Sequence, residues 1–171
     1  GHSTDYQTKI KLRELVEDGV GILKVGPGLT YAMREGLFAL AYAEKEQYKD
    51  EPEKQSHFME VLDEAMVKEP KYFAHHYYGT PAEIAFKRKF SFSDRCRYYL
   101  PQPEVEAAQA KLFANFKDGV PYGLLSQFMP IAYTKVREGK LNNDPVSLVK
   151  DRVINTVNEY LYASHQEEIK D

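Results

Sequence analysis

Two short segments combine small, hydroxyl-bearing and glycine residues in a way that could hold a negatively charged group. The chain opens with GHSTDYQ, and a second segment reads LKVGPGLT. Glycines let a backbone approach an anion closely, a lysine supplies positive charge, and hydroxyl groups donate hydrogen bonds. The candidate phosphate-binding residues are Ser3, Thr4, Asp5, Lys24, Gly26, Gly28 and Thr30. The alternative is that Gly-Pro-Gly only forms a tight turn.

Other residues that could bind a metal ion or an anion occur singly or in pairs. His2 is a candidate metal ligand, but a catalytic zinc needs about three protein ligands. His75 and His76 are adjacent, so their side chains point in different directions and do not form one ligand face. Arg95 and Arg97 could bind a phosphate, although pairing with the acids of a neighbouring helix is the default interpretation.

The glycine-rich turn separates a predicted strand from a predicted helix. Ile22, Leu23 and Val25 do not alternate with polar residues, which predicts a strand buried on both faces, as parallel strands are. The apolar residues that follow have helical spacing: Leu29, Met33, Leu37, Leu40 and Ala41. This pattern predicts one βα unit of an α/β protein. Lys24 should then lie at the open end of the sheet, where such folds place their sites.

The segment before this unit has two interpretations. Its polar residues could end a strand whose apolar body lies upstream, followed by a helix over Lys9–Gly19. Alternatively, Gly1-His2 is a remnant of cloning. Downstream, no further convincing strand occurs. The pattern there predicts helices over Gln55–Lys68, Pro81–Lys89 and Pro103–Lys117, and a last helix that Asp144 caps.

The composition excludes several classes of protein. The chain has 171 residues, of which 43% are apolar, enough for one ordinary core. Its net charge of −3 gives no basic surface for nucleic acid or anionic lipid. Apolar runs are far shorter than a membrane span. The single cysteine, Cys96, excludes an internal disulfide, fits a reducing compartment and should be buried. We therefore expect a cytoplasmic protein that binds neither nucleic acid nor membranes.

Five blocks of sequence, in one order, resemble a known family. They are HSTDYQ, ILKVGPGLTYAMREGLFAL, HHYYG, SFSDRCRYYLP and LLSQFMPIAYTKVREGKL, which together reach from His2 to Leu141. The chain resembles the C-terminal part of the GatZ/KbaZ family, the non-catalytic subunits of tagatose-1,6-bisphosphate aldolase. This resemblance argues against the cloning remnant.

The resemblance implies a fragment of a larger fold. Family members resemble (β/α)8 barrels, which take ~250 residues. Residues 1–45 would supply the last two βα units of the barrel, and residues 46–171 a helical extension that packs on it. As covered by this chain, the fold should be mostly α. The loops after strands seven and eight often bind phosphate, which places the candidate residues above at the mouth of the barrel.

The resemblance also implies a function. His2 lies where catalytic relatives place a zinc-binding histidine, but those relatives continue with a glycine-rich loop, whereas this chain continues with Ser3-Thr4-Asp5-Tyr6. We therefore expect no catalytic residue here, and an accessory subunit that supports the activity and stability of a catalytic aldolase subunit. Zinc would belong to that partner.

Three further expectations concern alternatives and assembly. The main alternative is a class II, metal-dependent ketose-bisphosphate aldolase in full-length form. A second is a sugar-phosphate-binding protein. The family has also carried a kinase label, but the chain has no GxxxxGK[ST] loop. We expect the protein to form an oligomer.

Overall fold

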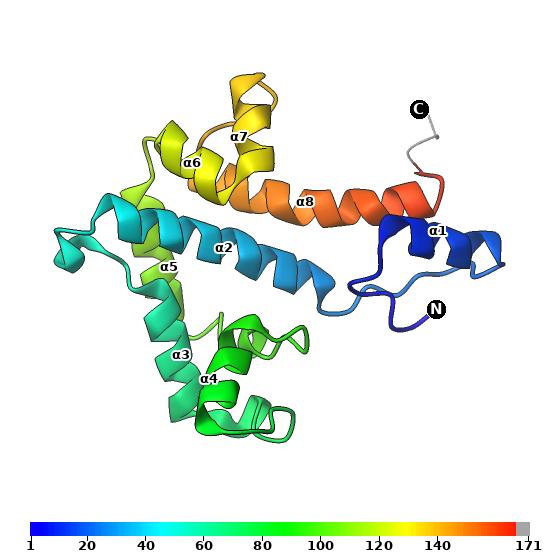
Figure 1. The fold of residues 1–171 in the computed structure, drawn as a ribbon, viewed down its shortest axis with the longest axis horizontal. Coiled ribbons are helices and arrows are strands. Elements are labelled where there is room, and N and C mark those ends of the chain that lie inside the picture. Colours follow the sequence, from blue (N-terminus) through cyan, green and yellow to red (C-terminus); the bar gives the residue numbers. More distant parts are fainter. Residues whose placement is uncertain (167–171) are drawn as a thin grey trace.

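The computed structural model describes residues 1–166, and helices are its only regular elements. Figure 1 shows their arrangement. The α-helices are α1 (Lys9–Glu17), α2 (Gly28–Gln47), α3 (Phe58–Lys68), α4 (Pro81–Phe90), α5 (Pro103–Asn115), α6 (Tyr122–Phe128), α7 (Pro130–Arg137) and α8 (Pro145–Ala163). Short 3-10 helices occupy Pro52–Lys54, Pro70–Tyr72 and Cys96–Tyr98. In this part of the chain, no helix has both the length and the apolar character that a membrane crossing requires.

The predicted strand is the main difference from expectation. Residues 20–26 have no regular secondary structure, and Ile22 is 79% exposed, so the prediction of a strand buried on both faces is wrong for residues 1–166. The Lys24 N–H donates to the Gly1 carbonyl at 2.9 Å, and the Gly1 amino group donates to the Ile22 carbonyl at 2.6 Å. These two bonds have the pattern of one residue pair in a parallel ladder.

The physical reason is the lack of neighbours. A buried parallel strand needs a paired strand on each side and helices over both faces. Within the described residues, the segment around Leu23 is paired through Gly1 alone. An α/β fold is therefore not formed by residues 1–166, whereas the expectation of a mostly helical chain is confirmed.

Two long helices connect the ends of the molecule. Helix α2 runs from the N-terminal segment to the cluster of shorter helices, and α8 runs back beside it toward α1 (Figure 1). A Cβ atom at Gly36 of α2 would lie 3.2 Å from the Cα atom of Val149 of α8. A side chain at this position would therefore require the backbone of α8 to shift. The predicted boundary at residue 45 falls inside α2 and remains a prediction.

The cluster of shorter helices holds most of the core. Helices α3 and α5 pack together and bury the apolar stripes that their spacing predicts. The stripe of α3 comprises Phe58, Leu62, Ala65 and Met66, and that of α5 comprises Val105, Ala108 and Leu112, followed by Phe116. Cys96 joins this core with no exposed surface, as the sequence predicts.

Candidate functional site

The glycine-rich turn is filled by a carboxylate from within the chain. Asp5 accepts the Gly28 N–H at 2.7 Å through Oδ1, and both of its carboxylate oxygens lie 3.0 Å from the Gly26 nitrogen. Gly28 begins α2, whose N-terminal end favours negative charge. The backbone donors predicted to hold a phosphate are thus satisfied by Asp5.

Both glycines are needed for this contact. A Cβ atom at Gly26 would lie 2.6 Å from Asp5 Oδ2, and one at Gly28 would lie 2.7 Å from Oδ1. Real Cβ atoms do not approach oxygen this closely, so either alanine would displace the carboxylate. The glycines therefore permit a close approach, as predicted, and the group that approaches is Asp5.

Two of the candidate hydroxyl groups, those of Thr4 and Thr30, make hydrogen bonds within the chain. Thr4 has no exposed surface, and its Oγ1 donates to the Lys24 carbonyl at 2.6 Å. The Tyr160 hydroxyl of α8 lies 3.1 Å from the same oxygen and supplies the proton of that bond, because Thr4 has only one to give. Thr30 donates to the Pro27 carbonyl at 2.9 Å, within the first turn of α2. The Thr4 contacts therefore join the N-terminal segment to residue 24 and to α8, whereas the Thr30 bond stays within α2.

The remaining candidates face solvent. The side chains of His2, Ser3 and Lys24 are exposed, and Ser3 has a left-handed backbone with φ of 60°. The described residues contain no group of three or more histidine, cysteine, aspartate or glutamate side chains placed to hold a metal ion. A zinc site that used His2 would therefore need ligands from outside residues 1–166.

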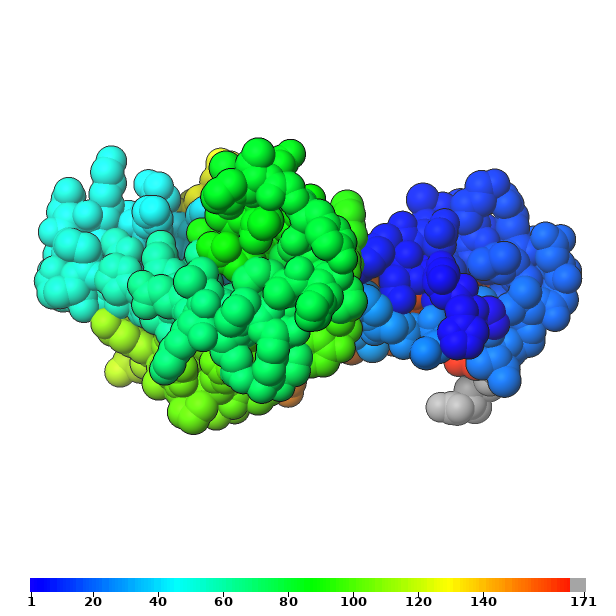
Figure 2. Space-filling view, turned by 90° about the horizontal axis from the view of Figure 1, so that it is seen from below, coloured from blue at the N-terminus to red at the C-terminus, as the bar shows by residue number. Residues whose placement is uncertain are grey.

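An aromatic cluster borders the loop. The ring of Tyr6 lies 5.1 Å from that of Tyr31 and 4.9 Å from that of Phe92. Burial raises the pKa of the Tyr6 hydroxyl, and the nearby charges of Asp94 and Asp5 raise it further. The cluster joins the N-terminal segment to the segment after α4, and Figure 2 shows the dark blue N-terminal part next to the green part of the chain.

A groove opens beside this cluster. It has a volume of about 490 Å³, and Tyr6, Tyr31, Phe92 and Tyr160 line part of it. Lys9 and Glu159 contribute charges of both signs. Gly28 of the closed glycine loop forms part of the wall of this groove.

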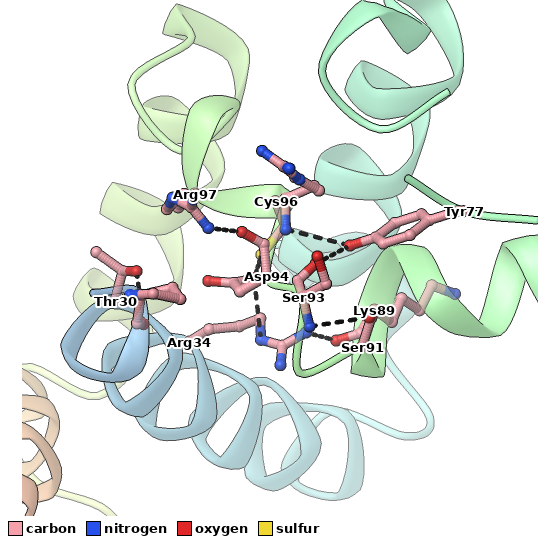
Figure 3. Close-up of polar contacts among 11 residues, drawn as sticks. Thr30, Arg34, Tyr77, Lys89, Ser91, Ser93, Asp94, Cys96 and Arg97 are labelled. Atoms are coloured by element: carbon pink, nitrogen blue, oxygen red, sulfur yellow. Dashed lines mark hydrogen bonds and ion pairs between the residues drawn. The ribbon is translucent and has the colours of Figure 1, made fainter. Parts of the chain in front are cut away.

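A buried charge pair holds the segment after α4 against α2. Arg34, 2% exposed, lies with its Nε atom 3.8 Å from Asp94 Oδ1 and donates to the Lys89 carbonyl. The Cys96 thiol donates to Asp94 Oδ1 at 3.0 Å, and burial, followed by the charge of Asp94, raises the pKa of the thiol. Figure 3 shows Asp94 between Arg34 and Cys96. A thiol kept protonated in this way is a poor nucleophile.

Sequence reasoning missed this pair and the aromatic cluster. One signal was available for Arg34, because Tyr31 and Phe38 occupy the same helical face at spacings of three and four residues. The Arg34 guanidinium lies over both rings, 4.2 Å from the centroid of Tyr31 and 5.6 Å from that of Phe38. Nothing in the local sequence pairs Asp94 with a helix 60 residues earlier.

Comparisons with known proteins place the chain in a family. The family described as D-tagatose-1,6-bisphosphate aldolase subunit GatZ/KbaZ-like matches residues 1–165. A protein named D-tagatose-1,6-bisphosphate aldolase subunit GatZ from Klebsiella pneumoniae subsp. pneumoniae is 43% identical over 167 residues, which cover 97% of this chain and 39% of that protein. The protein of the same name from Salmonella newport is 43% identical and matches 94% of this chain and 38% of its own length.

A solved structure agrees with these matches. The crystal structure of a probable tagatose 6 phosphate kinase from Sinorhizobium meliloti 1021 superimposes with a TM-score of 0.85 at 41% identity, over 94% of this chain and 41% of that one. The chain thus spans well under half the length of each of these relatives. By its family match and its sequence identity, the chain belongs to the GatZ/KbaZ-like family of D-tagatose-1,6-bisphosphate aldolase subunits.

Proposed function

We propose that this chain is the C-terminal part of an accessory subunit of tagatose-1,6-bisphosphate aldolase, and that it contributes to the activity and stability of a catalytic subunit. The relatives named above are called subunits of that aldolase, which implies a partner. The observation that carries the non-catalytic role is the Asp5 carboxylate, which occupies the backbone donors of Gly26 and Gly28. A substrate phosphate at this loop would have to displace it.

The proposal includes a place in a larger fold. Residues 1–45 would form the last two βα units of a (β/α)8 barrel, and residues 46–171 the helical extension. The parallel pairing between Gly1 and the backbone on either side of Leu23 supports this, because adjacent strands of such a barrel pair in parallel. The exposed Ile22 side chain would then be covered by the rest of the barrel. Zinc, and the reaction itself, belong to the catalytic subunit in this proposal.

Co-expression tests the accessory role. The protein and the catalytic aldolase subunit of the same organism are produced separately and together, and co-purification, aldolase rate and half-life at 37 °C are compared. The proposal expects a stable complex and a higher or longer-lived activity than the catalytic subunit has alone. A catalytic subunit that neither binds this protein nor changes in rate or half-life contradicts it.

The enzymatic alternative has its own readout. A class II aldolase requires bound metal and cleaves a ketose bisphosphate without a partner. We expect the isolated protein, supplied with zinc, to cleave no tagatose 1,6-bisphosphate. Cleavage that is lost in a His2→Ala variant and kept in a His57→Ala variant would instead support the enzyme, since His57 lies outside the candidate loop.

A further inference from the structure

A surface of tyrosine rings and arginine cations is formed by residues in or next to the 3-10 helices Pro70–Tyr72 and Cys96–Tyr98. It comprises Tyr72, Arg95, Arg97 and Tyr98, called here the Tyr–Arg patch. The rings of Tyr72 and Tyr98 are stacked with centroids 5.1 Å apart, and their residues are 36% and 42% exposed. Exposed tyrosines that are already ordered lose little conformational entropy when a partner covers them.

Both arginines of the patch lie over the same ring. The guanidinium carbon of Arg97 is 4.5 Å from the centroid of Tyr98, and that of Arg95 is 5.8 Å away. Arg97 also donates to the Tyr98 hydroxyl at 2.9 Å. The Arg95 Nη2 atom lies 2.8 Å from Nδ1 of His76. These contacts position the two cations but do not neutralise them.

Carboxylate partners for these arginines are lacking among residues 1–166. Neither Arg95 nor Arg97 has an acid of the described chain within ion-pair distance, so the default interpretation of ion-paired arginines is wrong here. Asp94, their neighbour in sequence, turns inward to Arg34. The Arg95 Nε atom is buried and has no hydrogen-bond acceptor among residues 1–166, whereas the Nη2 atom of the same guanidinium reaches the exposed His76.

The charge near the patch is correspondingly positive. Burial lowers the pKa of His76, and the neighbouring cations Arg95 and Arg97 lower it further. Lys71, which lies over the Tyr72 ring, is paired with Glu69, so this acid is not available to the arginines. A cationic surface in a chain of net charge −3 calls for an anionic partner.

We infer that the Tyr–Arg patch is the docking surface for an acidic segment of the catalytic aldolase subunit, whose carboxylates pair with Arg95 and Arg97 while its apolar atoms cover Tyr72 and Tyr98. The inference rests on the proposed function. A protein partner fits better than a small phosphate because the two stacked rings offer a broad exposed surface, and because tyrosine and arginine dominate the energetically important positions of protein interfaces. Nucleic acid is disfavoured by the net negative charge of the chain.

The test is an affinity measurement with the full protein and the catalytic subunit. Charge reversal in R95E/R97E should weaken binding by at least about 10-fold, and Tyr98→Ser by a similar factor while both cations are kept. Raising the salt concentration should weaken the unmodified pair more than the R95E/R97E pair. The matched control is Arg137→Glu, because Arg137 is exposed and donates to the Tyr133 hydroxyl at 2.8 Å with its guanidinium over that ring.

The outcomes separate this inference from the proposed function. If the unmodified protein fails to bind the catalytic subunit, the proposed function fails and the inference falls with it. If the unmodified protein binds, and both R95E/R97E and Tyr98→Ser bind as tightly as Arg137→Glu, only the inference fails. A second measurement tests whether the patch binds inorganic phosphate instead. A rise in melting temperature with phosphate that R95E/R97E abolishes, together with unchanged partner affinity, would assign the patch to a small anion and overturn the inference. Circular dichroism verifies that each variant is folded.

Discussion

The glycine loop and the Tyr–Arg patch both present groups that attract anions. The loop binds a carboxylate of the described chain, whereas the patch does not. At the loop, the Gly26 and Gly28 amides receive the Asp5 carboxylate. At the patch, the two guanidinium groups of Arg95 and Arg97 lie on a tyrosine ring without any acid of the described chain. The difference teaches that a donor-rich motif does not identify an open site. The position of the nearest carboxylate decides whether a partner can bind.

The largest expected effect concerns Arg34, the buried cation beside Asp94. Arg34→Met leaves the Asp94 carboxylate buried without its cation, and we expect a loss of about 3–5 kcal/mol in the free energy of unfolding. Urea denaturation measures it. Arg137→Met is the control and should change stability by about 0.5 kcal/mol or less. A loss for Arg34→Met no larger than that of the control would mean that Asp94 does not depend on Arg34.

The next effect concerns the closed loop. Asp5→Ala leaves the Gly26 and Gly28 amides without their acceptor, and we expect a loss of about 1–3 kcal/mol. Gly28→Ala should destabilise the protein as well, but much less in the Asp5→Ala background, because the clash is with the carboxylate itself. Urea denaturation of the four proteins gives the coupling. The exposed Asp118, changed to alanine, is the control. If the losses of Asp5→Ala and Gly28→Ala simply add in the double variant, contact with Asp5 is not what requires a glycine at position 28.

Asp144 repeats the arrangement at Asp5, since it accepts the Ser147 N–H at 2.9 Å at the start of α8. Hydrogen bonds from the Ser147 side chain and from the Ser147 backbone lower the pKa of Asp144 in the folded state. The carboxylate therefore stabilises the fold fully above its unfolded pKa of about 4, and this stabilisation is lost as the pH falls through the lower, folded value. We expect Asp144→Ala to lower the free energy of unfolding by about 1 kcal/mol at pH 6.

The pH dependence of that cost is measured by thermal melting. The melting temperatures of the unmodified protein and of Asp144→Ala should differ at pH 6 and converge as the pH falls below about 4. A difference that persists unchanged well below this pH would exclude the carboxylate as its source.

The smallest expected effect lies at the patch. Arg95→Gln removes a bond to an exposed histidine and no ion pair, so it should change the free energy of unfolding by about 0.5 kcal/mol or less. Lys71→Gln serves for comparison on the same surface. Urea denaturation measures this change. A loss in the free energy of unfolding above about 1.5 kcal/mol would show that Arg95 stabilises the fold, and the patch would then no longer differ from the loop in this respect.

The helices could be predicted because their signals are local. The stripe of Val105, Ala108 and Leu112 identifies α5, and Pro145 after Asp144 marks the start of α8. Helix α2 extends to Gln47, beyond the apolar stripe, and its last turns are packed, because Ala43 and Glu44 are buried and Glu44 accepts the Ser56 N–H. The strand prediction near Leu23 was wrong because its signal is not local. A strand depends on hydrogen bonds to neighbours, which no local pattern can supply.

The candidate site was predicted only in outline. The structure shows a close approach of Asp5 to the backbone at Gly26 and Gly28, while phosphate binding at these residues stays a prediction. The sequence could not reveal that the anion is Asp5, because the turn that brings residue 5 to residue 26 is set by tertiary packing. Asp94 lies inside beside Arg34, whereas the Arg95 Nη2 atom reaches the exposed His76, and the sequence alone does not predict these different positions of two neighbouring residues.

The narrow crossing at Gly36 has a consequence for the distant loop. Gly28 and Gly36 belong to the same helix, and Val149 belongs to the helix that carries Tyr160, whose hydroxyl reaches Thr4 beside Asp5. A bulkier residue at the crossing would press on the backbone of α8, so the contact between Tyr160 and Thr4 depends on a helix pair that has little room to change its spacing.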